Sequence, residues 1–227
     1  MISVVIPTVN AERLLPRCFD SLIPAAVRGV VREVIVSDAG STDTTLEIAD
    51  SAGAHIVHAR KGRGQQLAEG AAIARSDWLL FLHPETALEP GWEVEAESFI
   101  DQAVMEQPRA AVFRFALEDF GNAARRAEAL AGLRTAMFAL PYGDQGLLIS
   151  RRLYGELGGF RPIPLMEDVD LVRRLKRRQL VMLQARAVTS GIRYRSEGYL
   201  ARSLRNLSCM LLYFLRVPTR VLARLYG

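Results

Sequence analysis

Short apolar runs that each stop at a polar residue recur through the first 86 residues of the chain. They occupy residues 2–6, 30–37, 54–58 and 77–82. Runs of this length, rich in β-branched side chains, are typical of strands buried on both faces. Stretches with apolar residues at helical spacing separate them, at 10–23, 44–52 and 65–75, and Pro24 is expected to end the first of these helices. The alternation predicts a parallel sheet with helices on both faces.

The pattern in the second half is less regular. It predicts helices at 93–106, 122–138, 151–157, from the acidic run at 167–170 to about 179, and at 199–216. It predicts strands at 110–117, at 147–150 and from 181 to 183 or beyond. No repeat or linker interrupts the chain, so we expect one α/β domain over residues 1–227.

The predicted C-terminal helix at 199–216 is amphipathic. Leu204, Leu207, Leu211 and Leu215 share one of its faces. Such a face packs on the protein's own core, on a second copy of the chain, or on a membrane surface. All three outcomes are open from the sequence.

Composition narrows the class of protein. Of the 227 residues, 50% are hydrophobic and 24% are charged, which is typical of a globular domain. Cys18 and Cys209 lie far apart, which argues against a disulfide framework or zinc site and favours a reducing compartment. The apolar start at 2–6 lacks a basic region before it, so we expect no signal peptide and a cytoplasmic protein, with the inner membrane face as its surface if the C-terminal helix binds lipid.

Positive charge is concentrated toward the C-terminus. From Arg173 onward there are thirteen Lys and Arg residues against one acid, Glu197. This excess predicts an anionic neighbour, either the phosphates of a ligand or a membrane surface. No nucleic-acid-binding module is recognisable, so nucleic acid is not expected as a partner.

Polar side chains follow three of the predicted parallel strands. They are Thr8 and Asn10, then Asp38, then His83 and Glu85. Because ligands bind beyond the carboxyl ends of such strands, we expect these groups to meet at one edge. The carboxylate of Glu85 suits Mg²⁺ or Mn²⁺, ions that often bridge a protein carboxylate to substrate phosphates.

A basic, glycine-containing loop precedes the helix at 65–75. Lys61 and Arg63 flank Gly62 there, and the following helix adds the positive end of its dipole. A loop of this kind favours phosphate binding, although it is not a Walker A sequence.

Five short segments, in this order, resemble a family-two glycosyltransferase with the GT-A fold. They are IPTVN at 6–10, VSDAGSTD at 36–43, LFLHPE at 80–85, YGDQG at 142–146 and PLMED at 164–168. They are similar to a short subfamily often labelled arsenosugar-biosynthesis glycosyltransferases. The resemblance implies a Rossmann-like, mostly parallel sheet and an inverting transfer of sugar from a UDP- or GDP-linked donor to a hydroxyl acceptor. It also implies a nucleotide-binding half at 1–86 and an acceptor half at 87–227.

The resemblance also implies roles for individual residues. Donor-binding positions are Pro7, Thr8, Asn10, Asp38, Lys61, Arg63 and Gln66, with Arg193 or Arg195 as further contacts of the diphosphate. His83 and Glu85 occupy the metal-binding motif, Asp168 the position of the general base, and Asp144, Gln145 and Glu167 the acceptor side.

One departure from the family pattern affects the metal site. Glu85 stands where relatives usually carry Asp, which moves the carboxylate by roughly 1.5 Å. The alternative hypothesis is therefore a catalytically degenerate protein that binds a nucleotide or a partner on the same fold. A nucleotidyltransferase is disfavoured, because residues 7–10 lack the expected glycine-rich loop.

Overall fold

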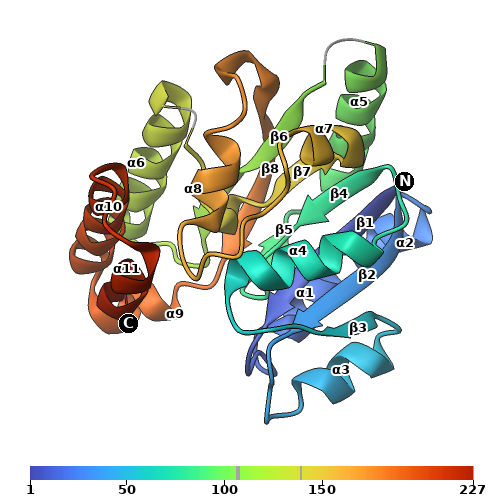
Figure 1. Ribbon diagram of the computed structural model, residues 1–227, viewed down its shortest axis with the longest axis horizontal. Helices are drawn as coiled ribbons and strands as arrows, with labels where there is room; N and C mark the ends of the chain where they lie inside the picture. Colours follow the sequence, from blue (N-terminus) through green and yellow to red (C-terminus); the bar gives the residue numbers. More distant parts are fainter. Residues whose placement is uncertain (106–107, 139, 227) are drawn as a thin grey trace.

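The computed structural model describes residues 1–105, 108–138 and 140–226, which build one eight-stranded sheet of order β3-β2-β1-β4-β7-β6-β8-β5 (Figure 1). The strands are β1 (Ile2–Thr8), β2 (Val31–Asp38), β3 (His55–His58), β4 (Trp78–Phe81), β5 (Thr86–Leu88), β6 (Ala110–Leu117), β7 (Leu147–Ser150) and β8 (Leu180–Thr189).

The N-terminal half of the sheet is parallel, as predicted. β1 lies between β2 and β4 and runs parallel to both, and β3 extends the parallel set beyond β2. β7 then runs antiparallel to β4 and β6, β8 is parallel to β6, and β5 closes the edge antiparallel to β8. A mostly parallel GT-A-type sheet is confirmed, with the antiparallel pairs confined to the second half.

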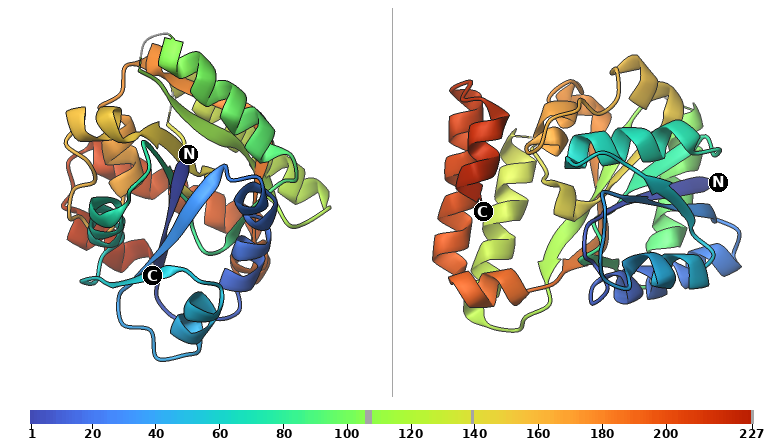
Figure 2. Two further views of the ribbon diagram at one scale, coloured as in Figure 1. Left: turned by 90° about the vertical axis from the view of Figure 1, so that its right-hand side faces the viewer. Right: turned by 60° about the horizontal axis from the view of Figure 1, so that its bottom comes forward.

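Helices cover both faces of this sheet. They are α1 (Leu15–Asp20), α2 (Ile23–Val27), α3 (Thr45–Ser51), α4 (Arg63–Ile73), α5 (Trp92–Met105), α6 (Asn122–Phe138), α7 (Arg151–Glu156), α8 (Glu167–Val172), α9 (Ile192–Glu197), α10 (Tyr199–Phe214) and α11 (Thr219–Tyr226). Figure 2 shows α4 on one side of the strands and α1, α2 and α5 on the other.

The alternation of side chains along β1 fills two separate cores. Val4 and Ile6 join the cluster under α1 and α5, whereas Val5 joins the cluster under α4 and α8. All three are fully buried. This two-sided burial explains why the first strand is apolar at successive positions.

The single helix predicted for residues 10–23 is wrong. The segment forms two short helices, α1 and α2, each with a proline in its first turn. Pro24 therefore begins α2 and does not end the preceding helix, because a first-turn proline has no intrahelical hydrogen bond to lose.

Other differences lie in the second half. The helix predicted to reach about residue 179 ends at Val172, and Lys176 adopts extended backbone before a 3₁₀ turn at Arg177–Gln179. β8 continues beyond Leu183 to Thr189, and β5, α9 and α11 were not anticipated. β5 has only three residues and exists through its ladder with β8, a tertiary contact that local sequence does not encode.

The C-terminal helix is amphipathic, as predicted. α10 lies beside α6 and α11 at the end of the molecule opposite β3 (Figure 1). Cys209 and Met210 on its inner face are buried against Leu222 of α11, whereas Leu204 and Leu211 are each 53% exposed. Among the helices of the described residues, none is both long enough and apolar enough to cross a membrane.

Candidate active site

The ends of β1 and β2 carry a closely bonded polar group. Asp38, only 1% exposed, accepts hydrogen bonds from the Thr8 hydroxyl (2.9 Å), from the backbone N–H of Gly40 (2.9 Å) and Ser41 (2.8 Å), and from the Ser41 hydroxyl. Burial opposes ionisation, but the bonds from Ser41, Thr8 and Gly40 outweigh it and hold the pKa of Asp38 below its usual value. The strand end is therefore a fixed negative charge.

Neighbouring residues hold this strand end in shape. Asn10, which has a left-handed backbone (φ 50°), accepts from the Thr42 N–H at 2.9 Å and so ties the loop after β1 to the loop after β2. Gln66 of α4 is buried and its amide nitrogen donates to the backbone oxygens of Thr8 and Ser37, both at 2.8 Å. Pro7 lies within β1 opposite Ser37. Gln66 thus ties the ends of β1 and β2, the predicted donor edge, to α4.

A cleft of about 160 Å³ opens at the same edge of the sheet. It brings together the side chains of Arg63, His83, Glu85, Asp144 and Asp168, which come from separate segments of the chain. All of them were predicted from sequence to belong to the site. Their convergence makes this cleft the candidate active site.

His83 and Glu85 follow β4 directly. His83 is 7% exposed, and its Nδ1 lies 4.0 Å from Oε1 of Glu85. The imidazole packs against the backbone of Gly143, where an added Cβ would come within 2.6 Å of Nε2. Glycine is therefore needed at 143 to admit the imidazole.

The divalent metal predicted at His83 and Glu85 fits there only if a ligand with phosphate groups binds at the same time. Among the described residues, no group of three or more His, Cys, Asp and Glu side chains is arranged to hold a metal ion. Two protein donors, one of them a carboxylate, are what a divalent cation needs when substrate phosphates supply further ligands. His83 and Glu85 suit a cation shared with a diphosphate.

Asp168 stands in the first turn of α8. Its Oδ2 accepts a hydrogen bond from the Gly143 N–H at 2.5 Å and its Oδ1 accepts one from the Val169 N–H at 2.7 Å. Met166, just before the helix, has a left-handed backbone (φ 65°) that turns the chain into α8. Two elements distant in sequence thus orient one carboxylate on the cleft.

Two further acids lie beside Asp168 without comparable support: Glu167 is buried and Asp144 is half-buried. Burial, with the negative charges of Asp168 and Glu85, raises the pKa of Asp144 to about 7 against the opposing charge of Arg134. Burial and Asp168 likewise raise the pKa of Glu167 to about 7. Within the part of the chain that the structure describes, Oδ1 of Asp144 and both oxygens of Glu167 have no hydrogen-bond partner.

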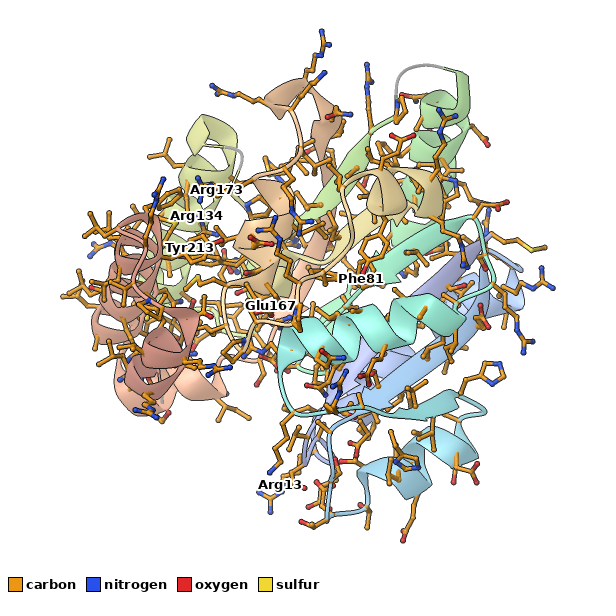
Figure 3. All side chains as sticks on the ribbon, viewed as in Figure 1. Arg13, Phe81, Arg134, Glu167, Arg173 and Tyr213 are labelled. Carbon is orange, nitrogen blue, oxygen red and sulfur yellow. The ribbon has the colours of Figure 1, made fainter. Side chains whose placement is uncertain are left out.

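Glu167 lies behind the cleft wall and does not line the cleft. Figure 3 shows it beside the N-terminal end of α4, where Oε1 is 3.9 Å from Nη1 of Arg63. Its neighbours include Phe81 and Phe160, with which it lines a much smaller cavity of about 20 Å³. An acceptor-side position was predicted for Glu167, but its side chain is 1% exposed.

Gln145 was also predicted on the acceptor side, but the structure places it inside the protein. It is fully buried, its Oε1 accepts from the Thr135 hydroxyl at 3.0 Å, and its Nε2 donates to the Phe113 backbone oxygen at 3.1 Å. Arg134 donates to the same Oε1 and stacks on the Tyr142 ring, 3.6 Å from its centroid. Gln145 therefore anchors the loop that carries Gly143 and Asp144.

The basic residues predicted to bind the donor lie in different surroundings. Arg63 lines the cleft, and Lys61 is exposed in the loop before α4. Arg195 does not line the cleft, because its Nη1 donates to the Glu118 backbone oxygen at 3.0 Å and lies 3.5 Å from Asp119. The side chain of Arg193 lies outside the described part of the structure.

Sequence reasoning missed the far wall of the cleft. Tyr142, Tyr194, Arg202 and Asn206 line it. The last two are four residues apart on α10, on the face opposite the exposed leucines. Helical periodicity could have identified them, because two polar residues on the inner side of an amphipathic helix face either a partner or a ligand.

Comparison with known proteins indicates the class of protein to which the N-terminal half is similar. Residues 3–110 match the model of Glycosyl transferase family 2, and they span the parallel half of the sheet, His83 and Glu85. The N-terminal half of the chain is therefore similar to members of this family.

Curated relatives align over that same half. A PGL/p-HBAD biosynthesis glycosyltransferase of Mycobacterium bovis is 34% identical over 95 residues, 39% of this chain and 36% of the relative. Glucosyl-3-phosphoglycerate synthase of Mycolicibacterium paratuberculosis is 38% identical over 90 residues, 36% of this chain and 27% of the relative. The aligned part thus spans about a third of each relative.

Solved structures extend the likeness to the whole fold. Glucosyl-3-phosphoglycerate synthase of M. tuberculosis has a TM-score of 0.65 at 24% identity, over 96% of this chain and 81% of that one. A mycobacterial protein has a TM-score of 0.58 at 25% identity, over 84% of this chain and 65% of that one. The second half, outside the family match, thus shares the GT-A fold.

Proposed function

We propose that this protein is an inverting glycosyltransferase that moves a sugar from a nucleoside diphosphate to a hydroxyl acceptor. The observation that carries the proposal is the cleft in which His83 and Glu85, at the end of a parallel strand, face the oriented carboxylate of Asp168. The match of residues 3–110 to Glycosyl transferase family 2 supports a sugar donor bound at that strand edge.

The donor is proposed to lie along the ends of β1 and β2. Thr8 and Asn10 border the nucleoside, and Asp38 accepts a hydrogen bond from a base N–H in exchange for the bond from the Ser41 hydroxyl. The ionised state of Asp38 supports this role. Uridine is the first base to test, because structures of glucosyl-3-phosphoglycerate synthase contain UDP-glucose and Mn²⁺.

Asp168 is proposed to take the proton of the acceptor hydroxyl while that oxygen attacks C1 of the sugar. The Gly143 and Val169 N–H groups fix the direction of its carboxylate. Arg63 and Lys61 lend positive charge to the departing diphosphate. When bound at His83 and Glu85, a divalent cation would neutralise further charge developing on the same group.

A thermal-shift panel tests donor binding. UDP, GDP, CDP and dTDP are each added with Mn²⁺, with Mg²⁺ and with chelator. We expect one nucleotide with Mn²⁺ to raise Tm most, because a ligand that binds the folded state alone stabilises it. No shift with any nucleotide, with or without metal, would remove the donor site from the proposal.

The second candidate is a binding protein that has lost transfer. The specific observation in its favour is Glu85, one methylene longer than the Asp that the family resemblance implies here, with Oε1 4.0 Å from the imidazole. Glu85→Asp separates the two candidates. Under our proposal the variant keeps or increases Mn²⁺-dependent hydrolysis of the donor, whereas neither form of a degenerate protein turns the donor over.

A further inference from the structure

The outward face of α10 is apolar from one end of the helix to the other. Its large exposed side chains, between 41% and 75% exposed, are Leu200, Leu204, Leu207, Leu211, Phe214 and, just after the helix, Leu215. A surface helix ordinarily turns its apolar stripe toward the protein core. In α10 polar residues lie on the inner side instead, where Arg202 and Asn206 line the cleft. Apolar exposure on this scale is typical of a surface that meets a partner or a membrane.

α11 adds to this apolar exposure. It lies beside α10 at one end of the molecule (Figure 2) and packs on it through the buried Leu222. Val221 and Leu225, one helical turn apart on α11, are both exposed. We call these two side chains and the six of the α10 stripe the α10–α11 surface.

Arginines border the α10–α11 surface, in a segment of the chain that has no acids. After Glu197 the sequence contains five arginines and no Asp or Glu. Arg216, Arg220 and Arg224 are exposed after α10 and on α11. Arg173 lies beside the rings of Tyr213 and Phe214 (Figure 3), with its guanidinium carbon 4.7 Å from the centroid of the Phe214 ring. An apolar face bordered by cations complements a bilayer that contains anionic lipid.

A second copy of the chain matches the α10–α11 surface less well. The exposed positions 200, 204, 207, 211 and 214 have the spacing of a coiled-coil seam, which acidic and basic residues usually flank and pair across. From Gly198 onward, however, arginine is the only charged residue type. A symmetric pair of such faces would bring like charges together. An anionic bilayer instead binds more tightly with each arginine near its surface, by about fivefold.

We propose that the α10–α11 surface docks on an anionic lipid bilayer. Its apolar side chains enter the headgroup region, while Arg216, Arg220 and Arg224 lie at the level of the lipid phosphates. The opposite side of α10 lines the cleft, so docking holds the cleft within one helix diameter, ~10 Å, of the lipid. The inference does not depend on the proposed glycosyl transfer.

Vesicle sedimentation tests the docking. The vesicles contain phosphatidylcholine alone or phosphatidylcholine with about 30 mol% phosphatidylglycerol. We expect the parent protein to bind the anionic vesicles more tightly than the neutral ones, by roughly tenfold or more, because several arginines contribute. Binding to the anionic vesicles should weaken as the salt concentration rises, because salt screens the attraction.

Two double variants separate the apolar and the electrostatic contributions. Leu204→Ser with Leu211→Ser removes apolar contact and should weaken binding to the anionic vesicles by roughly tenfold or more. Arg220→Gln with Arg224→Gln should weaken binding by roughly tenfold or more as well, and should reduce its dependence on salt. All four side chains are exposed, so both variants leave the buried core unchanged.

The matched controls change exposed residues of the N-terminal half. Val27→Ser with Ile73→Ser removes two exposed apolar side chains. Arg13→Gln with Arg32→Gln removes two exposed arginines. Both controls should bind the anionic vesicles within about twofold of the parent, because these residues lie outside the docking surface.

Light scattering without lipid examines the second copy as the occupant. We expect the parent and the Leu204→Ser with Leu211→Ser variant to have the same mass. A parent dimer that this variant converts to a monomer would assign the surface to self-association and overturn the inference. Three vesicle results would also overturn it: no binding of the parent to anionic vesicles, equal binding to both kinds of vesicle, or undiminished binding in both double variants.

Discussion

The donor edge at the ends of β1 and β2 and the acceptor side around Asp168 hold their acids in opposite ways. At the donor edge, Asp38 accepts four hydrogen bonds and keeps its pKa low. On the other side, Asp144 and Glu167 have pKa values raised to about 7, and three of their carboxylate oxygens lack a partner within the described ranges of the chain. The donor edge is therefore complete without its ligand, whereas the acceptor side leaves polar groups for a ligand or a proton to satisfy.

Asp168 belongs to both sides, and its replacement should have the largest effect. It is held by two N–H groups, as Asp38 is, yet it lines the cleft beside Asp144. We expect Asp168→Asn to lower kcat for transfer by about 10²- to 10⁴-fold, because the carboxamide cannot accept the proton. Nucleotide binding, measured by thermal shift, should change little. Unchanged turnover would remove Asp168 from the mechanism.

The donor edge should depend on Asp38 for stability. In Asp38→Ala the N–H groups of Gly40 and Ser41 lose a charged acceptor, so we expect the free energy of unfolding to fall by about 3 kcal/mol. Asp38→Asn is the matched variant. Its oxygen can keep both N–H bonds while the hydroxyls of Thr8 and Ser41 reverse to accept, so most of the stability should return in urea unfolding. Equal losses in both variants would show that charge, and not hydrogen bonding, holds the loop.

The donor side was predictable because its signals are local. Thr8, Asp38, His83 and Glu85 each follow a short apolar run, and parallel pairing of β1, β2 and β4 is enough to bring the ends together. The helices around them were predicted to within a few residues, apart from the break between α1 and α2.

The acceptor side depends on contacts between distant segments. Gly143 meets His83 and Asp168, which lie far from it in the sequence, and Gln145 is buried by α6 and β6. No local pattern distinguishes a buried, fully bonded Gln145 from an exposed one. The position of α10 over the cleft is likewise set by packing of Met210 and Leu222.

Gly143 contacts both His83 and Asp168, so its substitution tests whether the donor edge and the acceptor side are coupled. Gly143→Ala should cost about 1–3 kcal/mol of stability, because the added methyl meets the His83 ring at 2.6 Å and Oδ2 of Asp168 at 3.4 Å. Transfer should fall with it, since both residues must move. Gly132→Ala in α6 is the control: its Cβ meets no described atom within 4 Å, so helix propensity should raise stability by about 0.5–1 kcal/mol. If Gly143→Ala changed neither stability nor transfer, the His83 ring would be able to move aside without cost.

The smallest effect, about 1–2 kcal/mol or less on the free energy of unfolding, is expected for Glu167→Gln. The pH dependence of this effect should distinguish a buried acid with a raised pKa from one with a lowered pKa. The pKa of Glu167 is raised in the folded protein, so its contribution to stability is full below the unfolded value near 4.5 and is lost as pH rises toward 7. Asp38 has a lowered pKa and acts in the opposite sense, since its contribution is present above the unfolded value near 4 and is lost on acidification.

The glutamine side chain of the Glu167→Gln variant cannot ionise. The variant should therefore be more stable than the parent at pH 8, and the gap should close toward pH 4.5. Urea unfolding at both pH values gives the measurement, with exposed Glu47→Gln as the control. A gap that persists unchanged at pH 4.5 would mean that the buried amide gains new hydrogen bonds, and that the missing partners of Glu167 reflect packing and not its charge.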